Sequence, residues 1–253
     1  MNAVQIVSAL DLPAQAQVEQ RIPKRLVSEN GAPTAADKRA ISDSIEELWW
    51  LAALKPTTIG VAEYRDGVRE YLEIAVLRLA LRPGAKAGRL VELIHRAIPY
   101  PLLLIAEEGA RTSLSLAHKR WSQGEADKTV LDGEVTAVDW DAGLAGALQD
   151  GFCAQLALGR QPRSNLYALY QGWMDTALAL AAGMVTGVFA LSASPTQAAA
   201  RRHALDEHAR LEVEIARLRA AAAKTKQMAQ QVELNLEIRR LQTALSAAVA
   251  QME

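Results

Sequence analysis

The sequence predicts an α+β fold: a mixed β-sheet domain with flanking helices, followed by a helical region and a C-terminal coiled-coil or helical hairpin. Strand-like runs occur between residues 57 and 138. After Trp140 the apolar residues recur at helical spacing, and residues 196–253 contain neither Gly nor Pro. These observations divide the chain into a weakly patterned N-terminal segment (1–19), an α+β sheet domain (20–140), a helical region (141–195) and a coiled-coil helical segment (196–253).

The start of the chain predicts little regular structure before a first long helix. Residues 1–33 contain three prolines, which favour a short helix followed by extended chain. An apolar repeat at helical spacing then runs from Ile41 to Leu54, with Thr34 placed as an N-cap and Pro56 as a stop. We therefore expect an amphipathic helix over 35–54.

The pattern next changes to strands. The runs 57–64 and 69–81 are strand-like, and an Asp-Gly pair at 66–67, a favoured hairpin turn, connects them. Most residues on both faces of the second run are apolar, which is typical of an interior strand covered on two sides. Pro83 ends this strand.

The rest of the sheet domain alternates between helix and strand. Apolar spacing predicts a helix over 86–98, which the Pro-Tyr-Pro sequence at 99–101 ends. Further strands are expected over 102–106, 112–117 and 129–138, with a polar loop over 122–128.

The helical region predicts two helices on either side of a break at 159–162, with Ser164 as the cap of the second helix. Residues 176–200 carry no charge and are long enough to cross a membrane. Small residues dominate this stretch, however, so we expect a buried helix and no membrane association. The N-terminus has no basic residue ahead of an apolar core, so we expect no signal peptide and a cytoplasmic location.

The C-terminal segment carries two apolar seams with heptad spacing. The first runs from Leu211 to Ala222 and the second from Leu234 to Met252, and the two are out of register. The slip fits either a stutter in one long helix or the corner of a hairpin. A straight helix of this length would reach about 85 Å, far beyond the core of a domain. The seam must therefore be covered by another copy, a partner, or its own other half.

The second seam supplies the candidate partner-binding residues. A polar Asn235 lies beside the seam, where such a residue can fix register at a cost in stability. The sequence leaves two interpretations open: a coiled coil that selects its own pairing, or a docking face for a larger partner. The candidates are Leu234, Asn235, Ile238, Arg239, Leu241 and Leu245.

The charge balance excludes a global grip on nucleic acid. Lys and Arg number 28 against 29 Asp and Glu, for a formal net charge of -1. Only local basic clusters remain as nucleic-acid candidates, and a cluster that ends in a tryptophan can contact a phosphate backbone or a stacked base. The alternative is a solvated strand end with the tryptophan packed on the core. The candidates are Lys24, Arg25, Lys119, Arg120 and Trp121.

The sequence offers no catalytic motif. One cysteine rules out a disulfide framework within the chain, and the four histidines lack the spacing of a zinc site. The predicted elements follow the order of a restriction-endonuclease-like core, which is a helix, a hairpin, a second helix and a strand. Such a core needs a Glu-x-Lys motif on the second strand of the hairpin to position Mg²⁺ and the attacking water. The residues two after Glu70 and Glu73 are Leu72 and Ala75, so that motif is missing. We expect no metal and no cofactor.

Four sequence blocks carry a family resemblance. They are Ile22–Leu26 (IPKRL), Ala97–Pro101 (AIPYP), Leu116–Arg120 (LAHKR) and Val232–Leu241 (VELNLEIRRL). Together they resemble the bacterial domain-of-unknown-function family 4391. Genes of that family often lie beside helicase and DNA methyltransferase genes, in clusters that look like restriction or antiphage systems. The resemblance implies an accessory role in such a system and implies no catalytic residues.

We therefore expect a non-enzymatic assembly or regulatory subunit of a bacterial restriction-like or antiphage system that contains a helicase, a DNA methyltransferase or both. Its partner would be one of these subunits, another protein or a second copy, bound through residues 196–253, with any DNA contact local. The alternative is a nucleic-acid-processing enzyme on a restriction-endonuclease-like scaffold.

Overall fold

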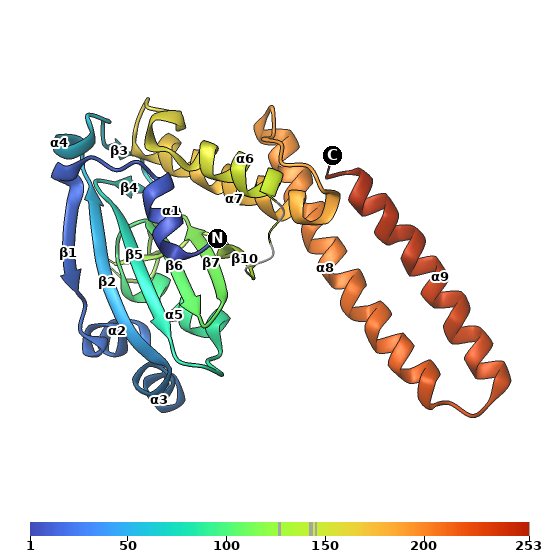
Figure 1. Ribbon diagram of the computed structural model, residues 1–253. Helices are drawn as coiled ribbons and strands as arrows, with labels where there is room; N and C mark the ends of the chain where they lie inside the picture. The colour runs from blue at the N-terminus through green and yellow to red at the C-terminus, as the bar shows by residue number, and fades with distance from the viewer. Residues whose placement is uncertain (126–127, 142–143, 145, 253) are drawn as a thin grey trace. The chain divides into compact units, whose positions relative to one another are not determined.

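The chain folds as two compact units, Met1–Ala177 and Leu178–Glu253 (Figure 1). The α+β fold class predicted from the sequence is confirmed, because the first unit holds a mixed sheet and the second holds the C-terminal helices. The structure is a computed structural model that describes residues 1–125, 128–141, 144 and 146–252.

Two predicted features fall partly outside the described residues. Residues 126–127 belong to the predicted loop 122–128, and residues 142, 143 and 145 belong to the predicted start of the helical region.

A six-stranded mixed sheet forms the centre of the first unit. Strands β5 and β6 are parallel and are connected through helix α5 (Ala87–Ala97), whereas the other neighbouring strands pair antiparallel. The strands lie in the order β1 (Gln17–Arg21), β2 (Ile45–Leu54), β5 (Ile74–Leu81), β6 (Leu102–Glu108), β7 (Arg111–Ala117) and β10 (Thr136–Trp140).

Strand β5 is the interior strand that the apolar pattern predicts. It lies between β2 and β6, and Ala75, Val76 and Leu77 are fully buried although they alternate between its two faces. Gly84 follows the strand with φ of 81°, a left-handed conformation that glycine adopts without strain. The predicted strand end at Pro83 therefore agrees with the structure.

Helices cover both faces of the sheet. Val27 of α2 (Lys24–Gly31), Ile41 of α3 (Ala35–Ser44) and Leu90 of α5 share one apolar cluster with alternate residues of β5 and β6. On the opposite face, Glu107 of β6 accepts a 3.0 Å hydrogen bond from the backbone nitrogen of Ala3 in α1 (Ala3–Ala9). The first unit is thus a three-layer arrangement of helix, sheet and helix.

The predicted helix over 35–54 is only half correct. Its first part is helix α3, and the Thr34 side chain accepts from the backbone nitrogen of Asp37 as the predicted cap. Residues 45–54 instead form strand β2. Two register irregularities in its pairing with β5, between Ile45 and Glu47 and between Trp50 and Ala52, shift its alternation. Ile45 and Leu48, three apart, consequently face the same core cluster and imitate a helical repeat.

The predicted strand over 57–64 is wrong for most of its length. Pro56–Ile59 form the short helix α4, whose first turn is closed by a 2.9 Å bond from the Lys55 backbone nitrogen to the Thr58 hydroxyl. Gly60 ends the helix with φ of 64°. Local capping has prevailed here over the β-propensity of the threonines.

The predicted Asp-Gly hairpin is confirmed on a smaller scale. Strand β3 (Tyr64–Arg65) pairs antiparallel with β4 (Glu70–Tyr71) in a separate two-stranded sheet. The Asp66 carboxylate accepts from the backbone nitrogens of Val68 (2.7 Å) and Arg69 (2.6 Å) and closes the turn.

A second small sheet replaces part of the predicted strand 129–138. Strand β8 (Lys119–Trp121) pairs with β9 (Thr129–Leu131), and only β10 joins the main sheet.

Residues 1–33 contain more structure than expected, because β1 and α2 form where extended chain was predicted. Helix α2 packs closely on α5 at Gly31, where a Cβ atom would collide with the carbonyl oxygen of Leu93. A glycine is required at that contact.

The helices predicted after residue 140 are α6 (Gly146–Leu156) and α7 (Leu166–Thr186). The predicted cap at Ser164 is shifted by one residue, because the Asn165 side chain accepts from the backbone nitrogen of Ala168 at 2.9 Å. Within the described residues, no helix has the length and apolar content that a membrane span requires.

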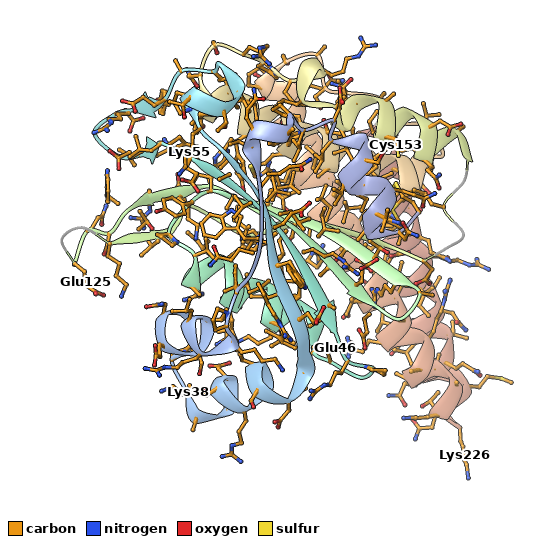
Figure 2. All side chains as sticks on the ribbon, turned by 60° about the vertical axis from the view of Figure 1, so that its left-hand side comes forward. Lys38, Glu46, Lys55, Glu125, Cys153 and Lys226 are labelled. Carbon is orange, nitrogen blue, oxygen red and sulfur yellow. The ribbon has the colours of Figure 1, made fainter. Side chains whose placement is uncertain are left out.

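The second unit settles the question left open by the two seams. Helix α8 (Pro195–Lys224) is followed by Thr225, whose ψ of 135° is extended, and α9 (Met228–Ala250) folds back as the second arm of a hairpin (Figure 1). Lys226 lies at its tip (Figure 2). Ile215 and Leu218 of α8 pack against Ile238 of α9, so the seam is covered by its own other half.

Candidate functional site

The candidate nucleic-acid residue Lys119 lies inside the first unit. Its side chain is only 1% exposed, and its ammonium donates to the carbonyl oxygens of His95 and, at 2.9 Å, Ile98. These carbonyls belong to the last turn and C-cap of α5, where a cation is favoured by the helix dipole. Burial lowers the pKa of Lys119 to about 7. The buried Lys119 side chain therefore connects β8 to the C-terminal end of α5.

Arg120 and Trp121 lie on β8, close to the surface. Arg120 donates to the Trp121 carbonyl oxygen at 3.2 Å and lies 3.7 Å from the Asp132 carboxylate. The same carboxylate binds Arg69 at 2.5 Å, so two guanidinium groups share one anion. Trp121 is partly buried and its backbone nitrogen donates to the Val68 carbonyl.

The other basic pair begins helix α2. The Lys24 ammonium donates to the Ser42 carbonyl at 3.2 Å, and Arg25 binds Glu29 one turn further along at 2.6 Å. The Arg25 side chain remains 84% exposed. The basic candidates thus divide between a buried structural lysine and surface groups on two different elements.

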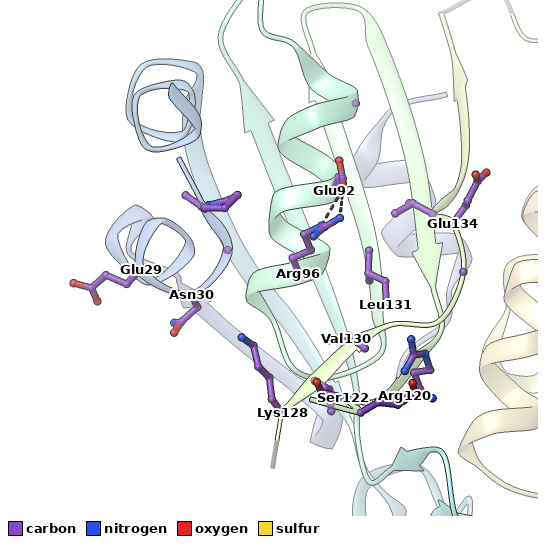
Figure 3. A pocket seen from close by; sticks show the side chains of 18 residues that line it. Glu29, Asn30, Glu92, Arg96, Arg120, Ser122, Lys128, Val130, Leu131 and Glu134 are labelled. Atoms are coloured by element: carbon purple, nitrogen blue, oxygen red, sulfur yellow. Dashed lines mark hydrogen bonds and ion pairs between the residues drawn. The ribbon is translucent and has the colours of Figure 1, made fainter. Parts of the chain in front are cut away.

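A polar pocket of about 970 Å³ lies between α2, α5 and the β8–β9 hairpin (Figure 3). Of the five predicted nucleic-acid residues, Arg120 alone is among the described residues that line it. Arg96 and Lys128 add positive charge, and Arg96 is already paired with Glu92 at 2.7 Å. Three acidic side chains, Glu29, Glu92 and Glu134, balance the three basic ones. This balance suits a neutral or zwitterionic polar group better than a polyanion.

A second, mainly apolar pocket of about 450 Å³ lies over β6, β7 and β10. Its floor includes small side chains such as Ala106, Ser115 and Ala137. The Ser115 hydroxyl lies 3.0 Å from His95 Nε2, and burial together with the Lys119 charge lowers the pKa of His95 to about 3. The imidazole is therefore neutral at physiological pH.

An aromatic cluster that the sequence reasoning missed joins α7 to the sheet. The Tyr71 hydroxyl lies 2.5 Å from His118 Nδ1, and Gln171 Oε1 lies 2.8 Å from His118 Nε2. Tyr167 stacks on the His118 ring with centroids 4.9 Å apart. The Tyr170 hydroxyl donates to the Leu102 carbonyl at 2.7 Å.

This cluster combines elements that are distant in sequence, and the sequence signal for it was weak. His118 falls in one of the four resemblance blocks, but its partners Tyr71 and Tyr167 do not. Burial raises the pKa values of Tyr71 and Tyr170, which keeps both hydroxyls protonated as hydrogen-bond donors.

The acidic residues weighed for a nuclease are occupied in ion pairs. Glu73 binds the Lys55 ammonium at 3.0 Å, and Glu70 binds Arg65 at 3.0 Å. Cys153 lies on α6 (Figure 2), and burial raises the pKa of its thiol. In the described part of the chain, no group of three or more His, Cys, Asp or Glu side chains is placed to hold a metal ion.

The structure divides the predicted partner-binding residues between two faces of α9. Ile238 belongs to the hairpin's internal cluster, and Leu234, Leu241 and Leu245 pack against that cluster. Asn235 and Arg239 are exposed. The four apolar candidates therefore stabilise the pairing of α8 with α9, and of the six candidates only Asn235 and Arg239 remain accessible to a partner.

The hairpin also exposes apolar side chains that lie outside the two heptad seams. Val213 of α8 is 71% exposed, and Met228, Val232 and Leu236 of α9 are 81%, 54% and 60% exposed. A search for heptad spacing identifies the seam that contains the most leucines. It does not identify a second apolar face on the same helix, here the face of α9 that carries Val232 and Leu236.

These features define a class of protein: a three-layer α+β domain followed by an α-helical hairpin with apolar groups on its outer faces. The chain belongs to the family described as Domain of unknown function (DUF4391), whose model matches residues 10–245 of the 253. The resemblance of the four blocks to this family is thereby confirmed. No curated protein and no solved structure matches the chain.

Proposed function

We propose that this protein is a non-enzymatic assembly or regulatory subunit of a bacterial restriction-like or antiphage system, and that its α8–α9 hairpin binds a helicase or DNA methyltransferase subunit. The observation that supports this proposal is that the hairpin buries one set of apolar side chains between its own helices and exposes another set. Its seam is satisfied internally, whereas Val213, Val232 and Leu236 remain exposed. Exposed aliphatic groups on a helix that needs no further partner for folding are suited to binding one.

The outer face of α8 is the part of the hairpin best suited to a partner helix. Val213 stands among the exposed small residues Ala209, Ala216 and Ala220, and these four residues follow one another at spacings of four, three and four. Small side chains let another helix approach closely, and Val213 would supply the apolar anchor. The flanking ion pairs Arg210–Glu207 and Arg217–Glu214 leave a polar rim.

The test is co-purification of the full chain with the helicase and methyltransferase products of its gene neighbourhood. Val213→Glu places a charge in the centre of the α8 outer face and should abolish capture. The control Gln242→Glu adds the same charge at an exposed position of α9 and should retain it. Unchanged capture of the Val213→Glu variant, or no capture by the unaltered chain, would refute the proposal.

The alternative proposal is a nucleic-acid-processing enzyme on a restriction-endonuclease-like scaffold. The order of β2, β5, α5 and β6 favours it, because an antiparallel pair of strands is followed by a helix and a further strand of the same sheet. Two observations argue against this enzyme. Glu73 is already engaged in an ion pair with Lys55, and position 75 is an alanine where the Glu-x-Lys motif needs a lysine. Cleavage of DNA with Mg²⁺, lost in a Glu73→Gln variant, would decide for the enzyme.

A further inference from the structure

The outer face of α9 carries two neighbouring aliphatic side chains. Leu236 lies two residues from both Leu234 and Ile238, about 200° around the helix, and so points away from the hairpin seam. Val232 lies one turn earlier on the same face, and the two side chains are 54% and 60% exposed. This face therefore presents an apolar spot on the side opposite α8.

The charges beside this spot are self-complementary. Glu233 and Arg240 lie seven residues apart and therefore share one flank of the outer face. If two copies of α9 cross antiparallel near Leu236, Glu233 of each copy lies level with Arg240 of the other. In a parallel two-fold pair, this flank of one copy would lie on the opposite side of the interface from the same flank of the other copy, so Glu233 could not face Arg240. The charge pattern thus selects the antiparallel arrangement.

The groups needed for this contact are accessible. The Arg240 side chain is 81% exposed, and its ion pair with Glu237 of the same helix is long, at 3.6 Å. Glu233 is exposed as well. Exchange of the intrahelical pair for an intermolecular one would leave the two Leu236 side chains in contact at the centre, with Val232 of each copy one helical turn away.

We infer that α9 binds a second copy of this chain through an antiparallel, two-fold symmetric contact centred on Leu236, flanked by two Glu233–Arg240 pairs. Such a contact uses the same patch on both copies and closes as a dimer. It deepens the proposed function, because it names one partner of the hairpin and leaves the α8 outer face for another subunit.

Charge reversal tests this inference in the full chain. Glu233→Arg places like charges in both flanking pairs, and Arg240→Glu does the same with the opposite sign. Each variant alone should dimerise about tenfold more weakly than the unaltered chain or worse. An equimolar mixture of the two should dimerise again, because every introduced arginine then faces a glutamate. Sedimentation velocity over a concentration series measures both effects.

Two controls keep the outcome interpretable. Helix content by circular dichroism should be unchanged, since both positions are exposed. Val213→Glu on α8 should leave dimerisation intact, which separates this contact from the one proposed for the helicase or methyltransferase.

Three results would overturn the inference. They are a monomeric chain at all concentrations up to about 1 mM, single variants that dimerise like the unaltered chain, and a mixture no better than its components. None of them bears on capture of another subunit through Val213, so the two proposals can fail separately.

Discussion

At the residue scale, the most informative side chains are buried and ionisable. Lys119 and His95 lie on neighbouring elements, and the Lys119 ammonium donates to the His95 carbonyl oxygen. The sequence groups Lys119 with Arg120 as nucleic-acid candidates, because the basic cluster follows the predicted strand 112–117, where both side chains were expected to be accessible. Alternation along β8 instead directs the Lys119 side chain inward, with Arg120 left near the surface.

Replacement of Lys119 by methionine should destabilise the chain, and more so at high pH. The pKa of Lys119 is lowered to about 7 in the fold from its ordinary value of 10.5, so between these two pH values the unfolded chain binds more protons than the folded chain. The stability that Lys119 contributes therefore rises with pH from about 7 to 10. In urea denaturation, Lys119→Met should cost on the order of 2 kcal/mol more at pH 9 than at pH 7. An equal or smaller cost at pH 9 would contradict this account.

His95 predicts sensitivity to acid. Burial lowers its pKa to about 3 from its ordinary value of 6.5, so its contribution to stability is lost as the pH falls from 6.5 towards 3. The unaltered chain should lose on the order of 2 kcal/mol more between pH 6.5 and 4 than a His95→Gln variant. Ser115→Ala keeps the histidine and should keep the pH slope. Parallel urea midpoints for the unaltered chain and the His95 variant would show the idea to be wrong.

At the element scale, periodicity predicted most of the helices and the interior strand β5. It failed at β2, where two bulges place Ile45 and Leu48 on one face and produce a helical spacing inside a strand. Bulges depend on the neighbouring strand, so the sequence of β2 alone could not reveal them. The aromatic cluster around His118 was missed for a related reason, since it exists only once α7 packs against the sheet.

The hairpin offers a matched pair of substitutions on α9. Ile238 is 8% exposed within the seam, whereas Leu236 is 60% exposed on the outer face. Ile238→Ala should cost the hairpin about 2–4 kcal/mol, and Leu236→Ala less than about 0.5 kcal/mol in the monomer. Hydrogen exchange of peptides from 228–250, followed at low protein concentration, measures both. Equal effects at the two positions would mean that α8 and α9 do not pair as described.

At the scale of the whole molecule, the sequence predicted the order of the parts but not how the last part is used. The two out-of-register seams indicated that something must cover them, and left open whether another copy, a partner or the segment itself did so. The loop at 225–227 decides the matter, because the extended backbone at Thr225 turns α9 back onto α8. The charge balance that excluded a global nucleic-acid grip is also visible in the polar pocket, where three basic and three acidic side chains meet.

The most direct test of the central claim is hydrogen–deuterium exchange of the full chain, free and in complex with the helicase or methyltransferase subunit that we propose as its partner. If the hairpin is the docking element, added protection should concentrate in peptides covering 209–223 of α8. Protection confined to Met1–Ala177, with α8 unchanged, would contradict the proposed role of the hairpin.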